Sequence, residues 1–122
     1  MDPELARTGR IIGCAISISD ALGHGFLEKV YETALAHDLG KAGFVAETQK
    51  RFAVRYDGIV VGEYRADLVV DRRIIVEVKA AKAIDPAHQA QVLNYLKATG
   101  LKVGLILNFG TPFVGIKRLM RS

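Results

Sequence analysis

The chain has 122 residues, of which 50% are hydrophobic and 25% are charged, a composition that is typical of one globular domain and argues against disorder. Seventeen Lys and Arg residues against 13 Asp and Glu residues give a net charge of +4, which permits a polyanionic partner without demonstrating one. Cys14 is the single cysteine, which excludes an internal disulfide framework and is typical of a reducing compartment. The acidic N-terminus is unlike a signal peptide, and no apolar run is long enough to span a membrane. The sequence therefore predicts one cytoplasmic domain over residues 1–122.

Two helices are predicted in the first third of the chain. Asp2 can cap the first helix and Pro3 fits its first position, and apolar residues then recur at helical spacing until Gly23 ends the helix. The second helix is predicted over residues 26–42, where apolar side chains again follow the helical period. Gly43 fits a cap at its C-terminal end.

The middle of the chain predicts a three-stranded antiparallel meander. Apolar residues alternate with polar ones over residues 52–56, which indicates a half-buried strand. The pair Asp57-Gly58 is a strong signal for a tight turn, and a second strand follows over residues 59–70. Three polar residues then form another turn, and the third strand is predicted over residues 74–79.

A crossover unit is predicted in the last third of the chain. Asp85 can cap a helix over residues 86–99, and the near-continuous apolar run of residues 103–108 predicts a strand with both faces covered. A strand, a helix and a strand in this order predict a right-handed crossover, with the new strand parallel to residues 74–79. With a last edge strand over residues 114–119, the predicted fold class is α/β, with a mixed sheet flanked by helices.

Acidic and basic residues stand at the end of the third predicted strand. Because side chains alternate faces along a strand, Glu77 and Lys79 share one face. A short turn before this strand makes Leu68 face Val76, and Asp67 then stands opposite Glu77, with Cβ atoms about 5 Å apart. Two carboxylates this close repel each other, and a divalent cation relieves the repulsion. Asp67 and Glu77 are therefore predicted to bind Mg²⁺ or Mn²⁺, beside the Lys79 ammonium, which can orient a water or offset charge on a phosphoryl oxygen.

Two of the helices are expected to add polar side chains to this site. In the crossover helix, His88, Gln91 and Tyr95 are spaced by three and four residues, so they share one helical face that can point back over the end of the sheet. In the second helix, Glu28 can complete the metal site or hold Lys79 in an ion pair. These groups are expected to converge at one end of the sheet.

The same residues, taken in chain order, resemble the PD-(D/E)XK nuclease superfamily in its RecB-like or lambda-exonuclease-like branch. This resemblance rests on Asp67, Glu77-Val78-Lys79, Gln91 and Tyr95. Within the superfamily, the chain is similar to the GxxExxY protein family, whose name motif matches the segment from Gly25 to Tyr31 in full. Further similar segments are found at residues 64–68, 89–100 and 108–110, so the resemblance spans nearly the whole chain.

The resemblance implies a restriction-endonuclease-like core of αβββαβ order with a metal-dependent phosphodiesterase site. In such a site, the aspartate that matches Asp67, the glutamate that matches Glu77 and the backbone carbonyl that matches Val78 hold the metal. The lysine that matches Lys79 assists the nucleophilic water. Ala66 stands where the superfamily's name has a proline.

The resemblance also implies roles for three residues on the helices. The glutamate that matches Glu28 lies on the helix packed beside the site, and we count it among the predicted metal ligands. Gln91 and Tyr95 match the glutamine–tyrosine motif of the branch, which contacts phosphate or the lysine.

Two kinds of function are compatible with these residues. The first is an enzyme that hydrolyses phosphodiester bonds of nucleic acid, with DNA as the expected substrate. The second is a catalytically silent homo-oligomeric assembly or nucleic-acid-binding module built on a nuclease-like core, and the apolar composition favours a homo-oligomer. A basic cluster on the meander fits either a solvated face or a path for nucleic acid; it consists of Lys50, Arg51, Arg55, Arg65, Arg72 and Arg73.

Overall fold

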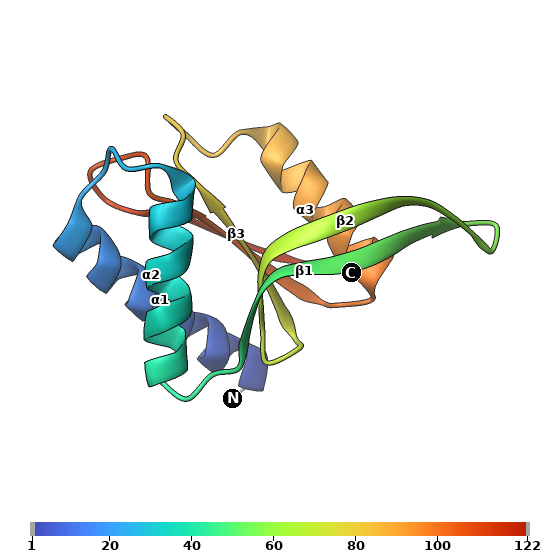
Figure 1. The fold of residues 1–122 in the computed structure, drawn as a ribbon, viewed down its shortest axis with the longest axis horizontal. Helices are drawn as coiled ribbons and strands as arrows, with labels where there is room; N and C mark the ends of the chain where they lie inside the picture. The colour runs from blue at the N-terminus through green and yellow to red at the C-terminus, as the bar shows by residue number, and fades with distance from the viewer. Residues whose placement is uncertain (1, 122) are drawn as a thin grey trace.

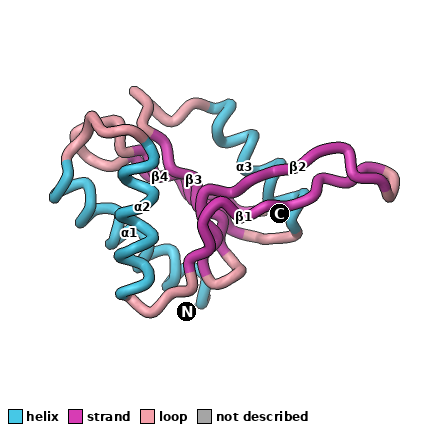
Figure 2. Tube along the Cα trace, viewed as in Figure 1, coloured by secondary structure: helices cyan, strands magenta, loops and turns pink. Residues whose placement is uncertain are grey.

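The computed structural model describes residues 2–121, which form three helices and one five-stranded sheet (Figures 1 and 2). The helices are α1 (Pro3–Leu22), α2 (Glu28–Lys41) and α3 (Pro86–Thr99). The strands are β1 (Ala46–Tyr56), β2 (Ile59–Val70), β3 (Ile74–Lys79), β4 (Val103–Asn108) and β5 (Gly115–Met120). The element order predicted from the sequence is confirmed.

The five strands lie in the order β1-β2-β3-β4-β5, and neighbours are antiparallel except for β3 and β4. The parallel β3–β4 pair confirms the predicted crossover through α3. Helices α1 and α2 cover one face of the sheet and α3 covers the other (Figure 1). The predicted α/β class with a mixed, helix-flanked sheet is therefore confirmed.

Each face of the sheet has its own hydrophobic core. The larger core joins α1 and α2 to alternate residues of the central strands, including Val76 and Leu105. The smaller core joins α3 to the residues between them, including Ile75 and Ile106. Because Ile75 and Glu77 lie on the same face of β3, the Glu77 side chain belongs to the face that α3 covers.

Helix α3 is fixed at both ends by its sequence. The Asp85 carboxylate accepts a backbone N–H of the first turn, and the His88 ring accepts the Asp85 N–H, which together form a capping box. At the other end, Gly100 adopts the left-handed conformation with φ of 77°, which a side chain would disfavour. The His88 side chain therefore caps the N-terminus of α3.

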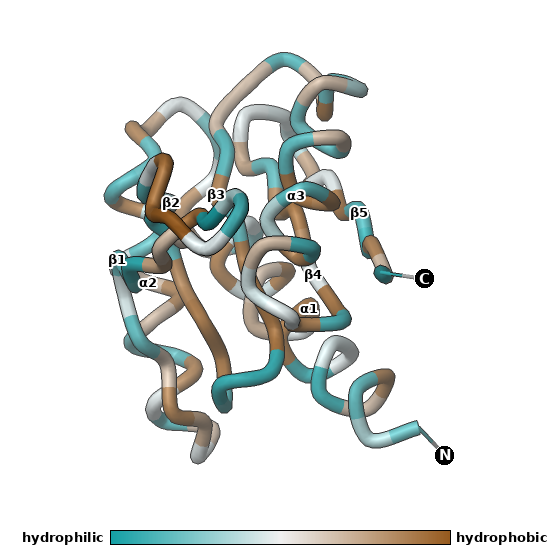
Figure 3. Tube along the Cα trace, turned by 90° about the vertical axis from the view of Figure 1, so that its right-hand side faces the viewer, coloured by the Kyte–Doolittle hydropathy of each residue, from teal (hydrophilic) through white to brown (hydrophobic). Residues whose placement is uncertain are grey.

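Strands β1 and β2 form a long hairpin that projects beyond the rest of the molecule (Figure 1). We refer to residues 50–65 as the hairpin arm. At its turn, Asp57 and Gly58 both have positive φ, 50° and 77°, as expected for the predicted tight turn. The tip exposes apolar side chains and faces the viewer in Figure 3, where the start of β2 is brown; these side chains are Tyr56, Ile59, Val60 and Val61, each more than half exposed.

Three predicted boundaries are wrong. β1 begins at Ala46, well before the predicted 52–56, because polar residues there pair with β2 and obscure the alternation. α2 begins later than predicted because Leu27 has extended backbone angles, φ −72° and ψ 156°. β5 is Gly115–Met120, one position beyond the predicted 114–119. Within residues 2–121, no helix is long and apolar enough to cross a membrane.

Candidate active site

The candidate site lies where β2 and β3 separate. The two strands pair through Leu68–Val76, Val69–Ile75 and Val70–Ile74, which confirms the predicted register. At the next position, Asp67 and Glu77, the two strands are joined by hydrogen bonds between backbone and side chain instead of backbone pairs. The Asp67 N–H donates to Glu77 Oε2 at 3.3 Å, and Asp67 Oδ2 accepts the Val78 N–H at 2.9 Å. Each carboxylate thus bonds the backbone of the other strand, and the two acidic side chains meet at this fork.

Glu77 is buried, with 6% of its surface exposed. Its other carboxylate oxygen, Oε1, accepts a hydrogen bond from the Tyr64 hydroxyl. Burial, followed by the nearby Asp67 charge, raises the pKa of Glu77 to about 8. Burial beside Asp67 thus favours the neutral form of the Glu77 carboxyl.

Three aromatic rings support Glu77 from the α3 side. Tyr95 of α3 stacks on Tyr64 with a centroid distance of 3.4 Å, and Phe52 stacks on Tyr64 at 5.9 Å. Burial and then the Glu77 charge raise the pKa of both tyrosine hydroxyls. Tyr95, predicted as a site residue, is thus brought beside the site and holds the ring of Tyr64, whose hydroxyl contacts Glu77.

Lys79 and Gln91 are less enclosed than the carboxylates. Lys79 is half-buried at the end of β3, on the Glu77 face, and no acidic side chain among residues 2–121 lies within ion-pair distance of its ammonium. Gln91 is exposed on α3, four residues before Tyr95. Lys79 thus ends the strand that carries Glu77, and Gln91 lies about one helical turn from Tyr95. Among residues 2–121, neither side chain is held by a hydrogen bond.

Glu28 contacts the chain immediately after Lys79. Its carboxylate is exposed at the start of α2, and Oε2 accepts the Ala80 N–H at 3.2 Å. In the described part of the chain, no three His, Cys, Asp or Glu side chains are grouped closely enough to hold a metal ion. Asp67 and Glu77 therefore stand as a pair, and the role of Glu28 as a third acidic ligand stays a prediction.

The segment after Lys79 is held by Asn108, which is 1% exposed. Asn108 Oδ1 accepts the Ala81 N–H at 2.9 Å and the Gly110 N–H at 3.1 Å, while Asn108 Nδ2 donates to the Ala81 carbonyl at 3.0 Å. One amide thus ties the end of β4 to the loop that leaves β3. The sequence did not indicate this role for Asn108, because a polar residue at the end of an apolar strand is common.

Sequence reasoning missed three residues at the fork, Glu32, Gln49 and Tyr64. Glu32 of α2 is 4% exposed and bonds Gln49 of β1, whose amide also reaches Asp67. Glu32 follows Glu28 by one helical turn, a spacing that puts both on one face of α2. Tyr64 lies three residues before Asp67, in the same strand. Gln49 has no sequence signal of its own.

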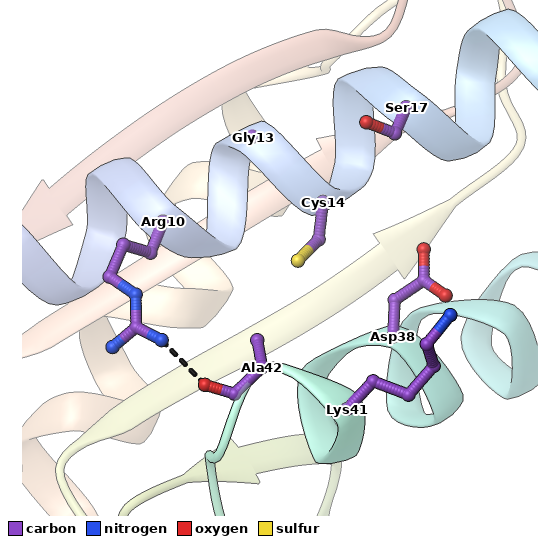
Figure 4. Close-up of a pocket in the computed structure, with 7 residues that line it drawn as sticks. All are labelled: Arg10, Gly13, Cys14, Ser17, Asp38, Lys41 and Ala42. Atoms are coloured by element: carbon purple, nitrogen blue, oxygen red, sulfur yellow. Dashed lines mark hydrogen bonds between the residues drawn. The ribbon is translucent and has the colours of Figure 1, made fainter.

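A separate pocket lies between α1 and the end of α2, away from the fork (Figure 4). Arg10 closes one end of it by donating to the Ala42 carbonyl at 2.6 Å. Burial and the neighbouring Asp38 raise the pKa of the Cys14 thiol, so this side chain stays protonated and is a poor nucleophile. The pocket therefore offers no chemistry comparable to that of the fork.

Comparison with known proteins identifies the family. The family model described as the PD-(D/E)XK nuclease superfamily matches residues 6–119. The chain belongs to this superfamily. The predicted restriction-endonuclease-like fold is confirmed with it, whereas membership of the narrower GxxExxY family stays a prediction.

Two solved structures share this superfamily member's fold. One, described as SSO0001, has a TM-score of 0.61 and 18% identity, over 77% of this chain and 50% of that one. The other, the alkaline exonuclease LHK-Exo from Laribacter hongkongensis, has a TM-score of 0.57 and 13% identity, over 77% of this chain and 56% of that one. The chain thus spans only about half the length of either protein. No curated protein matches the sequence.

Proposed function

We propose that this domain is a nuclease that hydrolyses phosphodiester bonds of DNA and depends on Mg²⁺ or Mn²⁺. The observation that carries the proposal is the fork, where Asp67 and Glu77 meet from neighbouring strands of a PD-(D/E)XK nuclease fold. Two buried or half-buried carboxylates in contact are costly unless a cation or a proton neutralises one of them.

The proposed metal ligands are Asp67, Glu77 and the Val78 carbonyl, with Glu28 as a further acidic ligand. All are hard oxygen donors, the type that Mg²⁺ and Mn²⁺ prefer. The raised pKa of Glu77, caused by burial and then by the Asp67 charge, supports the fit, since a cation would stabilise both carboxylates in their ionised form. A divalent cation held there supplies Lewis-acid activation of water and stabilises charge on the phosphoryl oxygens.

The remaining site residues are proposed to act on water and phosphate. Lys79 has an ammonium that no carboxylate of the described residues neutralises, so it is suited to orient the attacking water and to offset developing negative charge. Gln91 presents an exposed amide that can donate to a phosphate. Tyr95 keeps Tyr64 stacked in place, and Tyr64 in turn fixes the Glu77 carboxyl.

The hairpin arm is the proposed contact for duplex DNA. Arg51 and Arg65 lie directly opposite each other in the β1–β2 register, and both are exposed. Like charges in this arrangement repel each other. Glu63 lies 3.8 Å from Arg51 and partly offsets its charge, whereas no carboxylate of residues 2–121 lies within ion-pair distance of Arg65, so a DNA phosphate would relieve the repulsion. A two-stranded ribbon also fits the major groove. The arm joins the site directly, because Arg65 is two residues from Asp67.

A cleavage assay with an isosteric variant tests the proposal. Purified protein is incubated with single- and double-stranded DNA in Mg²⁺, in Mn²⁺ and in chelator. We expect metal-dependent cleavage that Asp67→Asn reduces at least a hundredfold, while Asp20→Asn, an exposed carboxylate on α1, serves as the matched control and cleaves normally. Equal cleavage by Asp67→Asn and the parent protein would refute the assignment.

The second candidate is a catalytically silent assembly module, and the exposed apolar tip of the hairpin arm favours it. A homo-oligomer is proposed for the enzyme as well, with the exposed apolar tip as its contact surface. The reduced Cys14 fits the proposed cytoplasmic location. Folded protein that forms a defined oligomer in light scattering, yet binds no Mn²⁺ and cleaves no DNA, would favour the silent module.

A further inference from the structure

Glu32 lies beside the fork with both of its carboxylate oxygens engaged. It is 4% exposed, although ionised side chains are rarely buried without partners. Oε2 accepts from the Lys29 ammonium at 2.6 Å, and Oε1 accepts from Gln49 Nε2 at 2.5 Å. Lys29 is mostly exposed, so the inward partner of Glu32 is Gln49.

The Glu32 carboxylate fixes which way the Gln49 amide points. A carboxylate only accepts hydrogen bonds, so the NH₂ end of the amide, and not its oxygen, must face Glu32. The same nitrogen lies 3.5 Å from Asp67 Oδ1, which places a second N–H of Gln49 towards Asp67 in a long hydrogen bond. Glu32 therefore determines that Asp67 meets a donor and not another oxygen.

Gln49 occupies a strained backbone conformation to make these contacts. Its φ of 51° lies in the left-handed region, which few residues other than glycine adopt and which is unusual inside a strand. The flanking pairs Thr48–Leu68 and Lys50–Ala66 remain in register. The surrounding structure thus holds Gln49 in a conformation that aims its side chain at Glu32 and Asp67.

We propose that Glu32 and Gln49 are positioning residues that hold Asp67 in the orientation it needs to bind a divalent cation. The proposal rests on the function proposed above, in which Asp67 is a metal ligand. The Val78 N–H fixes Oδ2 from β3, and the Gln49 amide fixes Oδ1 from β1. Each oxygen accepts one hydrogen bond from the protein and keeps a further lone pair for a cation. Such outer partners typically contribute 10- to 100-fold to metal affinity.

Calorimetric titration with Mn²⁺ alone tests this proposal without relying on activity. We expect Gln49→Leu to weaken Mn²⁺ binding about 10- to 100-fold, because it removes the donor to Asp67. Glu32→Gln should weaken it about tenfold, since a neutral amide no longer selects the orientation of Gln49. Glu47→Gln is the matched control on the same strand, because Glu47 bonds Lys50 and not Asp67, and it should bind as the parent protein does.

The double variant Glu32→Gln with Gln49→Leu separates positioning from general damage. If Glu32 acts through Gln49, the double variant binds Mn²⁺ no more weakly than Gln49→Leu alone. Where cleavage is measurable, kcat should fall with little change in the KM for DNA. Leucine at a positive φ can itself disturb β1, so Glu32→Gln, which keeps the backbone and the side-chain volume, provides the second test.

The outcomes distinguish the two proposals. A parent protein that binds Mn²⁺, with the affinity lost in Asp67→Asn and retained in both Glu32→Gln and Gln49→Leu, would overturn the positioning role alone. Variants that unfold at lower urea but bind Mn²⁺ normally while folded would also overturn it, since their role would then be only structural. A folded parent protein that binds no Mn²⁺ overturns the proposed function and the positioning role together.

Discussion

Gly110→Ala is expected to disturb the site through the loop that follows Lys79. A Cβ added at Gly110 would lie 2.2 Å from the Ala81 carbonyl oxygen, 2.5 Å from the Ala81 nitrogen and 2.7 Å from the Ala80 carbonyl carbon. All three are backbone atoms, so no side-chain rotation removes the clash. The chain can accept the methyl group only if the Ala80–Ala81 backbone moves away from Gly110.

The size of this movement follows from the contact distances. Ordinary contacts of a Cβ begin at 3.4 Å, so the backbone must shift by about 1 Å. That shift also strains the three hydrogen bonds by which Asn108 holds Ala81 and Gly110. Overpacking of this kind costs about 1–3 kcal/mol of unfolding free energy. Because Lys79 directly precedes the displaced loop, a misplacement of about 1 Å should also slow cleavage by about 10²-fold.

Urea unfolding and DNA cleavage measure the two effects separately. Gly115→Ala is the matched control at the same end of the sheet, because its Cβ would meet atoms only at 3.5 Å and beyond. It should change the unfolding free energy by less than about 0.5 kcal/mol. A Gly110→Ala protein as stable as Gly115→Ala would refute the packing argument, and normal cleavage by a destabilised Gly110→Ala would refute the link to Lys79.

Two further predictions concern charge. In the metal-free protein, folding raises the pKa of Glu77 from 4.5 to about 8, so the folded state binds a proton more tightly than the unfolded state does. The resulting contribution to the free energy of unfolding is full below pH 4.5 and is lost as the pH rises through 8. Urea unfolding in chelator from pH 5 to 9 should show this decline in the parent protein and lose it in Glu77→Gln; an unchanged slope would contradict the burial argument. Arg51→Gln and Arg65→Gln should each lower the slope of log K against log salt concentration for DNA binding by about one, without lowering the free energy of unfolding. DNA affinities measured at several salt concentrations check this prediction.

The sequence predicted the central strands and their register because local signals were sufficient there. Asp57-Gly58 defines one turn, and the short turn before β3 leaves only one pairing that buries Leu68 and Val76 together. Once that pairing is known, Asp67 and Glu77 must be neighbours. The first half of β1 was missed because Glu47 to Arg51 is polar, and its strand conformation comes from pairing with β2.

The residues around the carboxylates could not be predicted in the same way. Tyr64 and Ala66 pack with α3, whereas Leu68 packs with α1 and α2, so simple alternation along β2 fails at Asp67. Gln49 reaches the site through a backbone angle that sequence propensity disfavours for glutamine. Contacts that depend on a break in regular geometry leave no periodic pattern in the sequence.

Because Asp67 also bonds the backbone at the fork, alanine and asparagine at this position are expected to have different effects on stability. Where β2 leaves β3, the Val78 N–H has no strand partner on that side, and the Asp67 carboxylate supplies one. Alanine at this position would leave a buried donor unsatisfied, at a cost of about 1–3 kcal/mol, and would confound a loss of chemistry with a loss of structure. Asparagine keeps an oxygen that can accept the Val78 N–H, and it removes the negative charge together with the oxygen that accepts the long hydrogen bond from Gln49. A loss of Mn²⁺ binding in a stably folded Asp67→Asn protein therefore reports on the carboxylate that the cation requires.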